Sequence, residues 1–390
     1  MLLVDLTHTS HTTACTGIQR QARGVFGALQ RCAAATGVCF DPFAAAWRCL
    51  DEHELRLARG APTDSGAQRS ASWPLQRKLR SWTARLAGRT PPLPPADGFV
   101  CAEIFSPRVA GALTPIFNHT GGPRVAFFFD TIPLTHPEFT PPKTVARFPA
   151  YLRELLLFDG IAANSRTTAD SLLAYWRWLG VATPPAVTVL PLGAESPADR
   201  APVDRPPGAP ARILCVGTIE GRKNHLALLA AAEALWAEGL HFELRLVGMP
   251  RPETAAPALA QLRRLQAAGH PLRFDGVLDQ PALEAAWREC SFSVYPSMIE
   301  GFGLPVIESL TFGKPCVCAA TGATGELVSG GGCVGVASPD AAGFATAIRQ
   351  LLTSPSALTR LAAEARNRAV PTWEDTARHL LDWMQSLPRR

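Results

Sequence analysis

Short apolar strands that alternate with amphipathic helices constrain this chain more than any other feature. In the first half we predict strands at 2–6, 99–104, 124–130, 160–165 and 186–193, and helices at 18–36 and 165–179. Strands that are apolar along their whole length are typical of a parallel sheet covered by helices on both faces. Ser165 is the predicted N-cap of the second helix. The first half is therefore predicted to be a doubly wound α/β domain.

The alternation stops at 194–211, a stretch rich in Pro, Ala and charged residues that reads as an exposed linker. It then restarts, with strands predicted at 212–217, 242–248, 272–277, 291–297 and 315–320 and helices at 224–239, 252–269, 280–290 and 303–313. We expect two doubly wound domains, 1–193 and 212–370, facing across a cleft between the carboxyl ends of their strands, where such sheets bind ligands.

Composition narrows the class of protein. A chain of 390 residues with 47% hydrophobic and 18% charged residues is long enough for two globular domains. A net charge of +5 without a concentrated basic face gives no reason to expect a nucleic-acid partner. The ten cysteines form no CxxC pair, and several lie in apolar strands, so they are expected to be buried thiols rather than disulfides or zinc ligands.

The N-terminus has neither a basic region nor a long apolar run, so it is predicted to be a strand and not a signal peptide. No stretch of about 20 apolar residues is present that could span a membrane. Together with thiols that are expected to be reduced, these features favour the cytoplasm, with a peripheral position on the inner face of the plasma membrane as a further option.

One segment, about 66–90, interrupts the strand–helix rhythm. It is basic and contains no acidic residue, and Leu75, Leu79, Trp82 and Leu86 repeat on one face of a predicted helix. A helix of this kind can lie on an anionic membrane surface. It can equally pack its apolar face on the N-terminal domain and leave a solvated basic side. Both interpretations stay open. The basic residues are Arg69, Arg77, Lys78, Arg80, Arg85 and Arg89.

The segment 297–315 carries the most specific pattern, in which Glu300 and Glu308 flank a glycine-containing turn that leads into a helix. Gly301 and Gly303 let the backbone approach a ligand closely, and the N–H groups of the first helical turn favour an anion such as a diphosphate. Glu308 lies in an apolar stretch, where a solvated carboxylate is less expected. We predict that it accepts hydrogen bonds from two vicinal hydroxyls rather than facing solvent.

Two further loops follow predicted strands. Arg222 and Lys223 lie between a strand and a helix, where a guanidinium and an ammonium can bind phosphate, although an exposed basic turn gives the same pattern. Gly17 precedes a helix in the first domain, without a dinucleotide or P-loop fingerprint. Asp130 ends an apolar strand and is a candidate site residue, whereas His136 is expected to be structural. No DxD pair occurs, so no metal site is predicted.

These motifs together resemble a known family. GTIEGRKNH (217–225), EGFGLPVIE (300–308) and TWEDTARHLL (372–381) are similar to retaining glycosyltransferases of the GT-B fold, family 4, particularly mannosyl- or rhamnosyltransferase-like members of bacterial polysaccharide assembly. The second domain matches over nearly its whole length, and the first matches more thinly. The resemblance implies transfer of a hexose-type sugar from a nucleotide-diphosphate donor to a glycan or lipid-linked acceptor. It implies no cofactor besides this donor substrate. The fold implies that 371–390 is a helix crossing back to the first domain.

Carried over by position, the resemblance assigns Arg222 and Lys223 to the donor diphosphate and Glu308 to the ribose hydroxyls. It assigns Glu300 to the sugar and phosphates, together with the backbone N–H groups of Phe302, Gly303 and Leu304. The implied mechanism is electrostatic, with a donor phosphate oxygen taking the acceptor proton and no protein nucleophile.

In the first domain the resemblance assigns Gly17 to a loop that closes over the diphosphate and Asp130 to the neighbourhood of the acceptor. Two positions depart from the family pattern. Phe129 stands where the family often has His, and Thr218 stands where many members have Arg. They favour the alternative of a catalytically degenerate nucleotide-sugar- or glycan-binding scaffold. A nucleotide-sugar epimerase is a further alternative, but the sequence lacks an evident acid–base pair for it.

Overall fold

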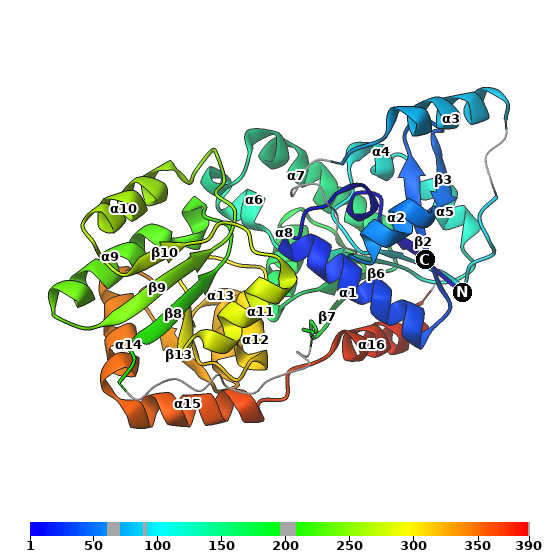
Figure 1. Ribbon diagram of the computed structural model, residues 1–390. Helices are drawn as coiled ribbons and strands as arrows, with labels where there is room; N and C mark the ends of the chain where they lie inside the picture. Colours follow the sequence, from blue (N-terminus) through cyan, green and yellow to red (C-terminus); the bar gives the residue numbers. More distant parts are fainter. Residues whose placement is uncertain (61–70, 89–91, 196–207, 389–390) are drawn as a thin grey trace. The chain divides into compact units, whose positions relative to one another are not determined.

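The chain forms two units, each built on its own sheet. The computed structural model describes residues 1–60, 71–88, 92–195 and 208–388. Unit 1 consists of Met1–Thr135, Pro141–Gly193 and Pro371–Arg390, and unit 2 of His136–Thr140 and Ala194–Val370 (Figure 1). Most of the predicted linker 194–211, and parts of the basic segment 66–90, lie outside the described residues.

The described residues of unit 1 form a seven-stranded sheet in the order β3-β2-β1-β4-β5-β6-β7. All neighbouring pairs are parallel except β2 and β3, which form an antiparallel hairpin. Strands β1, β4 and β6 are buried along their whole length, as their apolar sequences predict. The bounds are Leu2–Asp5 (β1), Ala35–Asp41 (β2), Ala46–Cys49 (β3), Gly98–Cys101 (β4), Arg124–Phe128 (β5), Gly160–Ala163 (β6) and Ala186–Val189 (β7).

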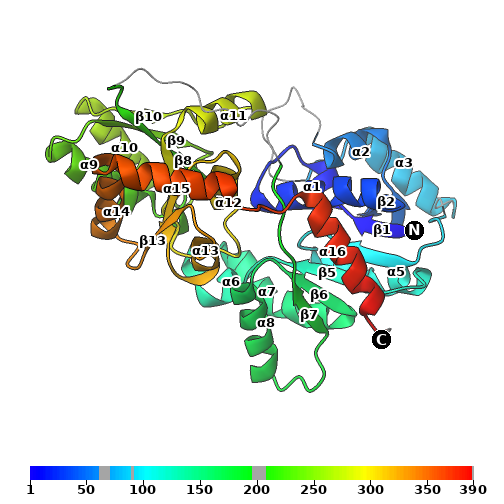
Figure 2. The ribbon, with the colours of Figure 1, turned by 90° about the horizontal axis from the view of Figure 1, so that it is seen from below.

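The helices of unit 1 include one from the far C-terminal end of the chain. Helix α16 packs along α1, and a Cβ on Gly24 would lie only 2.4 Å from the ring of Trp373 (Figure 2). Ser165 caps α8 by accepting a hydrogen bond from the Thr168 N–H, which confirms the predicted N-cap. The bounds are Gly17–Cys32 (α1), Glu52–Ala58 (α2), Leu75–Leu86 (α3), Pro107–Ala110 (α4), Leu113–His119 (α5), Ile132–Thr135 (α6), Pro142–Glu154 (α7), Arg166–Trp178 (α8) and Trp373–Ser386 (α16).

Unit 2 has a parallel sheet, with six strands among the described residues in the order β10-β9-β8-β11-β12-β13. Its bounds are Ala211–Val216 (β8), Phe242–Val247 (β9), Leu272–Phe274 (β10), Phe292–Tyr295 (β11), Cys316–Ala319 (β12) and Cys333–Val336 (β13). The helices are His225–Ala237 (α9), Ala256–Ala267 (α10), Gln280–Glu289 (α11), Leu304–Thr311 (α12), Gly322–Val328 (α13), Ala341–Thr353 (α14) and Pro355–Asn367 (α15). Two α/β units, each with a mostly parallel sheet, confirm the predicted fold class.

The structure corrects several predicted boundaries. The helix predicted at 18–36 ends at Cys32, because Ala35 already begins β2 and pairs with Leu2 of β1. The predicted helix at 252–269 is shorter, at Ala256–Ala267. The hairpin of β2 and β3 was not predicted, because its residues lack a clear two-residue alternation.

The ten cysteines are all free. No helix in the described part of the chain is both long and apolar enough to cross a bilayer.

Candidate active site

The order of the strands creates a switch point in unit 2. From β8 the chain continues outward through β9 and β10, and it then returns to place β11 on the other side of β8. The two strands are parallel, with Ile213 opposite Phe292, so their carboxyl ends lie at the same edge. The loops that follow them, 217–224 and 296–303, are therefore neighbours. Ligands of open α/β sheets bind at this kind of position.

Arg222 and Lys223 lie on the first of these loops, in a single 3-10 turn. Asn224 ends the turn with a φ of 55°, in the left-handed region, and α9 begins at the next residue. The second loop holds this turn directly, because the Met298 N–H donates to the Arg222 carbonyl at 2.9 Å and Ser297 Oγ donates to it at 3.2 Å. The two loops are thus joined by backbone contacts, and the positions of the two cations depend on both.

The carboxylate of Glu300 gathers the cluster. Its Oε1 accepts hydrogen bonds from Tyr295 Oη at 2.7 Å and Ser297 Oγ at 2.5 Å, and it lies 2.8 Å from a guanidinium nitrogen of Arg222. Lys223 Nζ donates to the same oxygen and to Tyr295 Oη. The side chains of Lys223 and Glu300 are 11% and 9% exposed, so these charges interact with little screening by solvent.

Burial and charge act against each other on the pKa values of this cluster. Burial alone would raise the pKa of Glu300, but the nearby Arg222 and Lys223 lower it below its ordinary value. Burial lowers the pKa of Lys223, and the carboxylate of Glu300 opposes this effect. Burial also lowers the pKa of His225, to about 3, so this imidazole is neutral. The cluster therefore holds an ionised carboxylate beside a guanidinium whose pKa is raised despite its burial.

Sequence reasoning missed the residues that support this cluster. Glu220 Oε1 lies 2.9 Å from Arg222 Nε, and its other oxygen is 2.7 Å from a guanidinium nitrogen of Arg251. Glu220 thereby fixes the orientation of the Arg222 guanidinium. Tyr295 contacts both Lys223 and Glu300 from the end of β11. Only their positions in the sequence could have indicated that these two residues belong to the cluster, because Glu220 lies two residues before Arg222 and Tyr295 ends a buried strand.

Helix α12 follows the second loop. Gly303 caps it with a φ of 117°, a backbone conformation that favours glycine, and Pro305 follows near the start of the helix. Pro305 has no N–H, so Phe302, Gly303 and Leu304 are the residues just before it that can offer backbone donors. Glu308 lies one turn inside the helix and is 7% exposed.

The remaining predicted residues belong to unit 1. Gly17 is the first residue of α1, and the preceding loop is held by two buried carboxylates at the ends of β1 and β4. Glu103 accepts hydrogen bonds from the backbone of His8 and Thr9, and Asp5 accepts them from Thr7. These two carboxylates organise the loop before Gly17.

Asp130 follows β5 and accepts a hydrogen bond from the Ile132 N–H at 2.9 Å. Phe129 beside it is buried at 4% exposure, so the aromatic ring at this departure from the family pattern is part of the core. Thr218, the other departure, is partly buried in the loop after β8.

Unit 2 thus brings Arg222, Lys223 and Glu300 into direct contact and places Glu308 on the helix that follows them. Gly17 and Asp130 are positioned by unit 1. Among the residues that the structure describes, no group of three or more His, Cys, Asp or Glu side chains could hold a metal ion.

Comparison with known proteins identifies the relatives of this chain. Residues 210–354 match the family model described as glycosyl transferases group 1. Glycogen synthase of Mycobacterium tuberculosis is 34% identical over 165 residues, which cover 42% of this chain and 39% of that protein. The serotype-specific mannosyltransferase WbdA of Escherichia coli is 26% identical over 326 residues, covering 79% of this chain and 37% of that protein. The chain thus spans well under half the length of these two curated relatives.

Among solved structures, Alr3699/HepE of Anabaena, in complex with UDP and glucose, matches with a TM-score of 0.68. The match covers 99% of both chains at 14% sequence identity, so it establishes the fold of the chain. Residues 210–354 are thus similar to the group 1 glycosyltransferases, and the chain has the GT-B fold.

Proposed function

We propose that this chain is a glycosyltransferase that moves a hexose-type sugar from a nucleotide-diphosphate donor to a glycan or lipid-linked saccharide. The observation that carries the proposal is the pair of cations, the partly buried Arg222 and the buried Lys223, held by Glu300 at the switch point of unit 2. A fixed guanidinium and an adjacent ammonium suit the two phosphates of such a donor. The similarity to HepE, whose structure contains UDP and glucose, and to the mannosyltransferase WbdA supports the donor class and the reaction.

In the proposed complex the diphosphate binds Arg222 and Lys223. The N–H groups at the start of α12 contact the same phosphates, where the helix dipole favours negative charge. Glu308, inside this helix, accepts hydrogen bonds from the ribose hydroxyls. The backbone donors are those of Phe302, Gly303 and Leu304.

The proposed chemistry retains the anomeric configuration. As the donor's glycosidic bond breaks, Arg222 and Lys223 stabilise the charge that develops on the departing diphosphate. The acceptor oxygen forms its bond to the anomeric carbon on the face from which the diphosphate departs, and an oxygen of that diphosphate takes the acceptor proton, so neither a protein nucleophile nor a divalent metal is needed. Glu300 keeps the two cations fixed before the donor binds, which lowers the reorganisation that the reaction requires. In unit 1, the loop before Gly17 has a proposed role in binding the donor diphosphate, and the carboxylate of Asp130 has a proposed role in binding the acceptor. The proposed location of the enzyme is the cytoplasm.

The test is thermal stability against a panel of nucleotide sugars and free nucleotides, with magnesium and with a chelator. A donor at about a hundred times its Kd stabilises the folded state by about 2.7 kcal/mol. Glu308→Gln removes the negative charge from the group that accepts hydrogen bonds from the ribose. The substitution should raise the Kd of the donor by about tenfold or more. Glu238→Gln is the matched control, because Glu238 pairs with Arg349 on the surface of the same unit. It should keep the full shift.

The outcomes separate the candidates. A donor-specific shift that the chelator leaves intact, and that Glu308→Gln reduces while Glu238→Gln does not, supports the proposed site, and transfer to an acceptor then establishes the reaction. Tight donor binding with no turnover would favour the scaffold. Conversion of a free nucleotide sugar to its epimer would replace the transferase by an epimerase. If no nucleotide or nucleotide sugar shifts the melting temperature, the proposed donor site is contradicted.

A further inference from the structure

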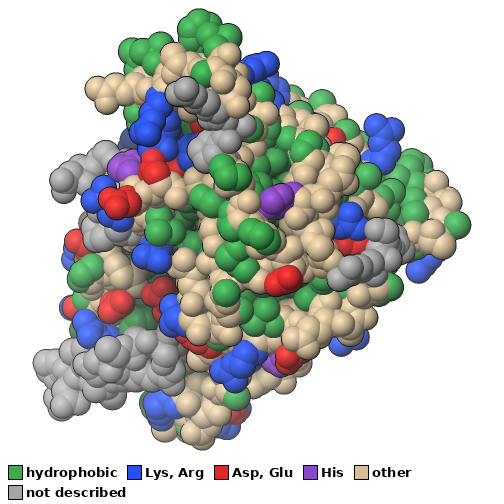
Figure 3. Space-filling model, turned by 90° about the vertical axis from the view of Figure 1, so that its right-hand side faces the viewer, with side chains coloured by type: hydrophobic (Ala, Val, Ile, Leu, Met, Phe, Trp, Pro, Cys, Tyr) green, Lys and Arg blue, Asp and Glu red, His purple; other side chains and the backbone are tan. Residues whose placement is uncertain are grey.

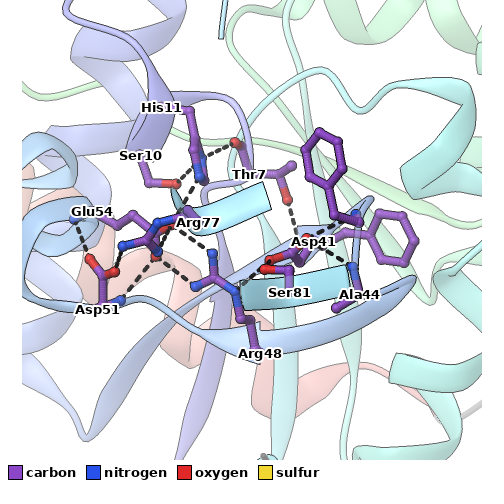
Figure 4. Close-up of polar contacts among 12 residues, drawn as sticks. Thr7, Ser10, His11, Asp41, Ala44, Arg48, Asp51, Glu54, Arg77 and Ser81 are labelled. Carbon is purple, nitrogen blue, oxygen red and sulfur yellow. Dashed lines mark hydrogen bonds and ion pairs between the residues drawn. The ribbon is translucent and has the colours of Figure 1, made fainter. Parts of the chain in front are cut away.

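Helix α3 is attached to unit 1 by its polar side. Arg77 donates to Glu54 Oε1 at 2.6 Å and pairs with Asp51, and Ser81 Oγ donates to Asp41 Oδ2 at 2.7 Å (Figure 4). Glu54 and Asp41 are 1% and 0% exposed. The helix therefore reaches buried carboxylates with its charged and hydroxyl groups rather than a hydrophobic surface with its leucines.

The buried carboxylates are themselves fixed in place. Arg48 binds Glu54 through two hydrogen bonds of 2.7 Å and Asp41 through one of 3.0 Å. His11 Nε2 lies 2.9 Å from Glu54, and the His11 ring stacks on Trp73, just before the helix, with ring centroids 3.7 Å apart. Burial alone would raise the pKa of Glu54, but Arg48 and His11 lower it, so the carboxylate is ionised. This ionic network sets which side of α3 faces the protein.

The opposite side of α3 is apolar and exposed. Leu75, Leu79, Trp82 and Leu86 are 70%, 55%, 54% and 69% exposed, and no residue of the helix is buried. At 3.6 residues per turn these four side chains share one face. The structure therefore contradicts the interpretation that this helix packs its apolar face on the domain and leaves a solvated basic side. A contiguous exposed apolar face on a helix marks an interaction surface.

The charged residues of α3 itself are all positive. Arg80 and Arg85 are exposed, and Lys78 lies over the ring of Phe43 at 5.5 Å. The helix has no acidic residue. Figure 3 shows hydrophobic side chains at the top of the view, where α3 lies, with lysine and arginine side chains nearby. An indole and three leucines on one face of a helix whose charged residues are all positive match the boundary between acyl chains and anionic headgroups.

We propose that α3 docks unit 1 onto an anionic lipid bilayer. Leu75, Leu79, Trp82 and Leu86 insert at the level of the headgroups, and Arg80 and Arg85 contact lipid phosphates. The ionic network on the other side of the helix keeps this face turned outward before binding, so that little ordering is needed on contact. The inference is independent of the proposed catalytic function. Docking through α3 would bring a transferase to a lipid-linked acceptor.

The test is co-flotation of the full chain with vesicles of phosphatidylcholine, with and without phosphatidylglycerol. The wild-type protein should bind only the anionic vesicles. The affinity of the double variant Leu79→Glu, Trp82→Glu for the anionic vesicles should be lower by about tenfold or more. Trp178→Glu is the matched control, because Trp178 is 77% exposed on α8 of the same unit. It should bind as the wild type does.

Arg80→Gln together with Arg85→Gln separates the charge from the apolar face. It should weaken binding mainly at low salt, where attraction between charges is strongest. Because all five altered positions in these three variants are exposed, their melting temperatures should equal that of the wild type, which excludes misfolding. The inference is overturned if wild type ignores anionic vesicles, if the Leu79 and Trp82 variant binds as well as wild type, or if Trp178→Glu loses as much. It is also overturned if sedimentation shows a dimer that this variant dissociates, because a second copy would then cover the face.

Discussion

At the scale of residues, the candidate site is a set of buried and partly buried charges that depend on one another. Glu300 contacts both cations, and Glu220 orients Arg222 from the other side. The sequence placed Arg222, Lys223 and Glu300 on loops after strands, because each loop is recognisable locally. It could not show that Tyr295 and Glu220 join them, because these contacts arise only when β8 and β11 become neighbours.

Glu300→Gln should lower the free energy of unfolding by about 3–5 kcal/mol at pH 7, because the buried Lys223 and the partly buried Arg222 lose the carboxylate that they share. Since the pKa of Glu300 is lowered from 4.5 in the folded state, its contribution is present above pH 4.5 and is lost as the pH falls through the folded pKa. The difference from wild type should therefore stay constant from pH 7 to pH 5 and shrink only at more acidic pH. Urea unfolding of both proteins, monitored by hydrogen exchange in the strands of unit 2, measures this difference in stability from pH 7 down to acidic pH.

Free UDP should stabilise Glu300→Gln at least as much as wild type, because its phosphates supply the negative charge that the variant lacks. Glu238→Gln should change stability by no more than about 0.5 kcal/mol, since its carboxylate is exposed. A loss of stability that UDP cannot restore would mean that the cations do not face the diphosphate.

At the scale of elements, α1 shows how one glycine can be required by a neighbouring helix while another is not. A Cβ on Gly24 would lie 2.4 Å from Trp373 of α16, whose indole is rigid. A Cβ on Gly27 would meet only the end of the Arg31 side chain, at 3.4 Å. Both residues look alike in the sequence, because helical periodicity does not reveal that a helix from the far end of the chain packs here.

Gly24→Ala should therefore destabilise the protein by about 1–3 kcal/mol through overpacking. Gly27→Ala on the same helix should stabilise it by up to about 1 kcal/mol, since alanine has the higher helix propensity. Chemical denaturation of the two single variants compares them directly. Equal effects of the two substitutions would contradict the close packing of α1 on α16.

At the scale of the whole molecule, the chain leaves unit 1 and returns to it. Helix α16 follows all of unit 2, yet it pairs with Arg31 through Glu374 and hydrogen-bonds the Pro191 carbonyl through Thr376. A Cβ on Gly160 of β6 would lie 2.6 Å from the ring of Trp383. The stability of unit 1 thus depends on a helix that follows unit 2 in the chain.

A chain that ends at residue 370 should lose protection from hydrogen exchange in α1 and β6, because the apolar surface under α16 becomes exposed. Strands β8 and β9 of unit 2 should exchange as in the full chain. Mass spectrometry of deuterated peptides measures both, and a chain ending at 387 serves as the control. Equal loss of protection in both units would contradict the assignment of α16 to unit 1.

The sequence by itself determined the class of fold, the cap of α8 at Ser165, and the loops that carry Arg222, Lys223 and Glu300. These features depend on local periodicity and on residues a few positions apart. Only the tertiary structure decided which strands are neighbours, and so brought Lys223 to Glu300 across 77 residues of sequence. It also decided the direction of α3, because periodicity defines an apolar face but a buried ionic network determines whether that face turns toward the core or toward solvent.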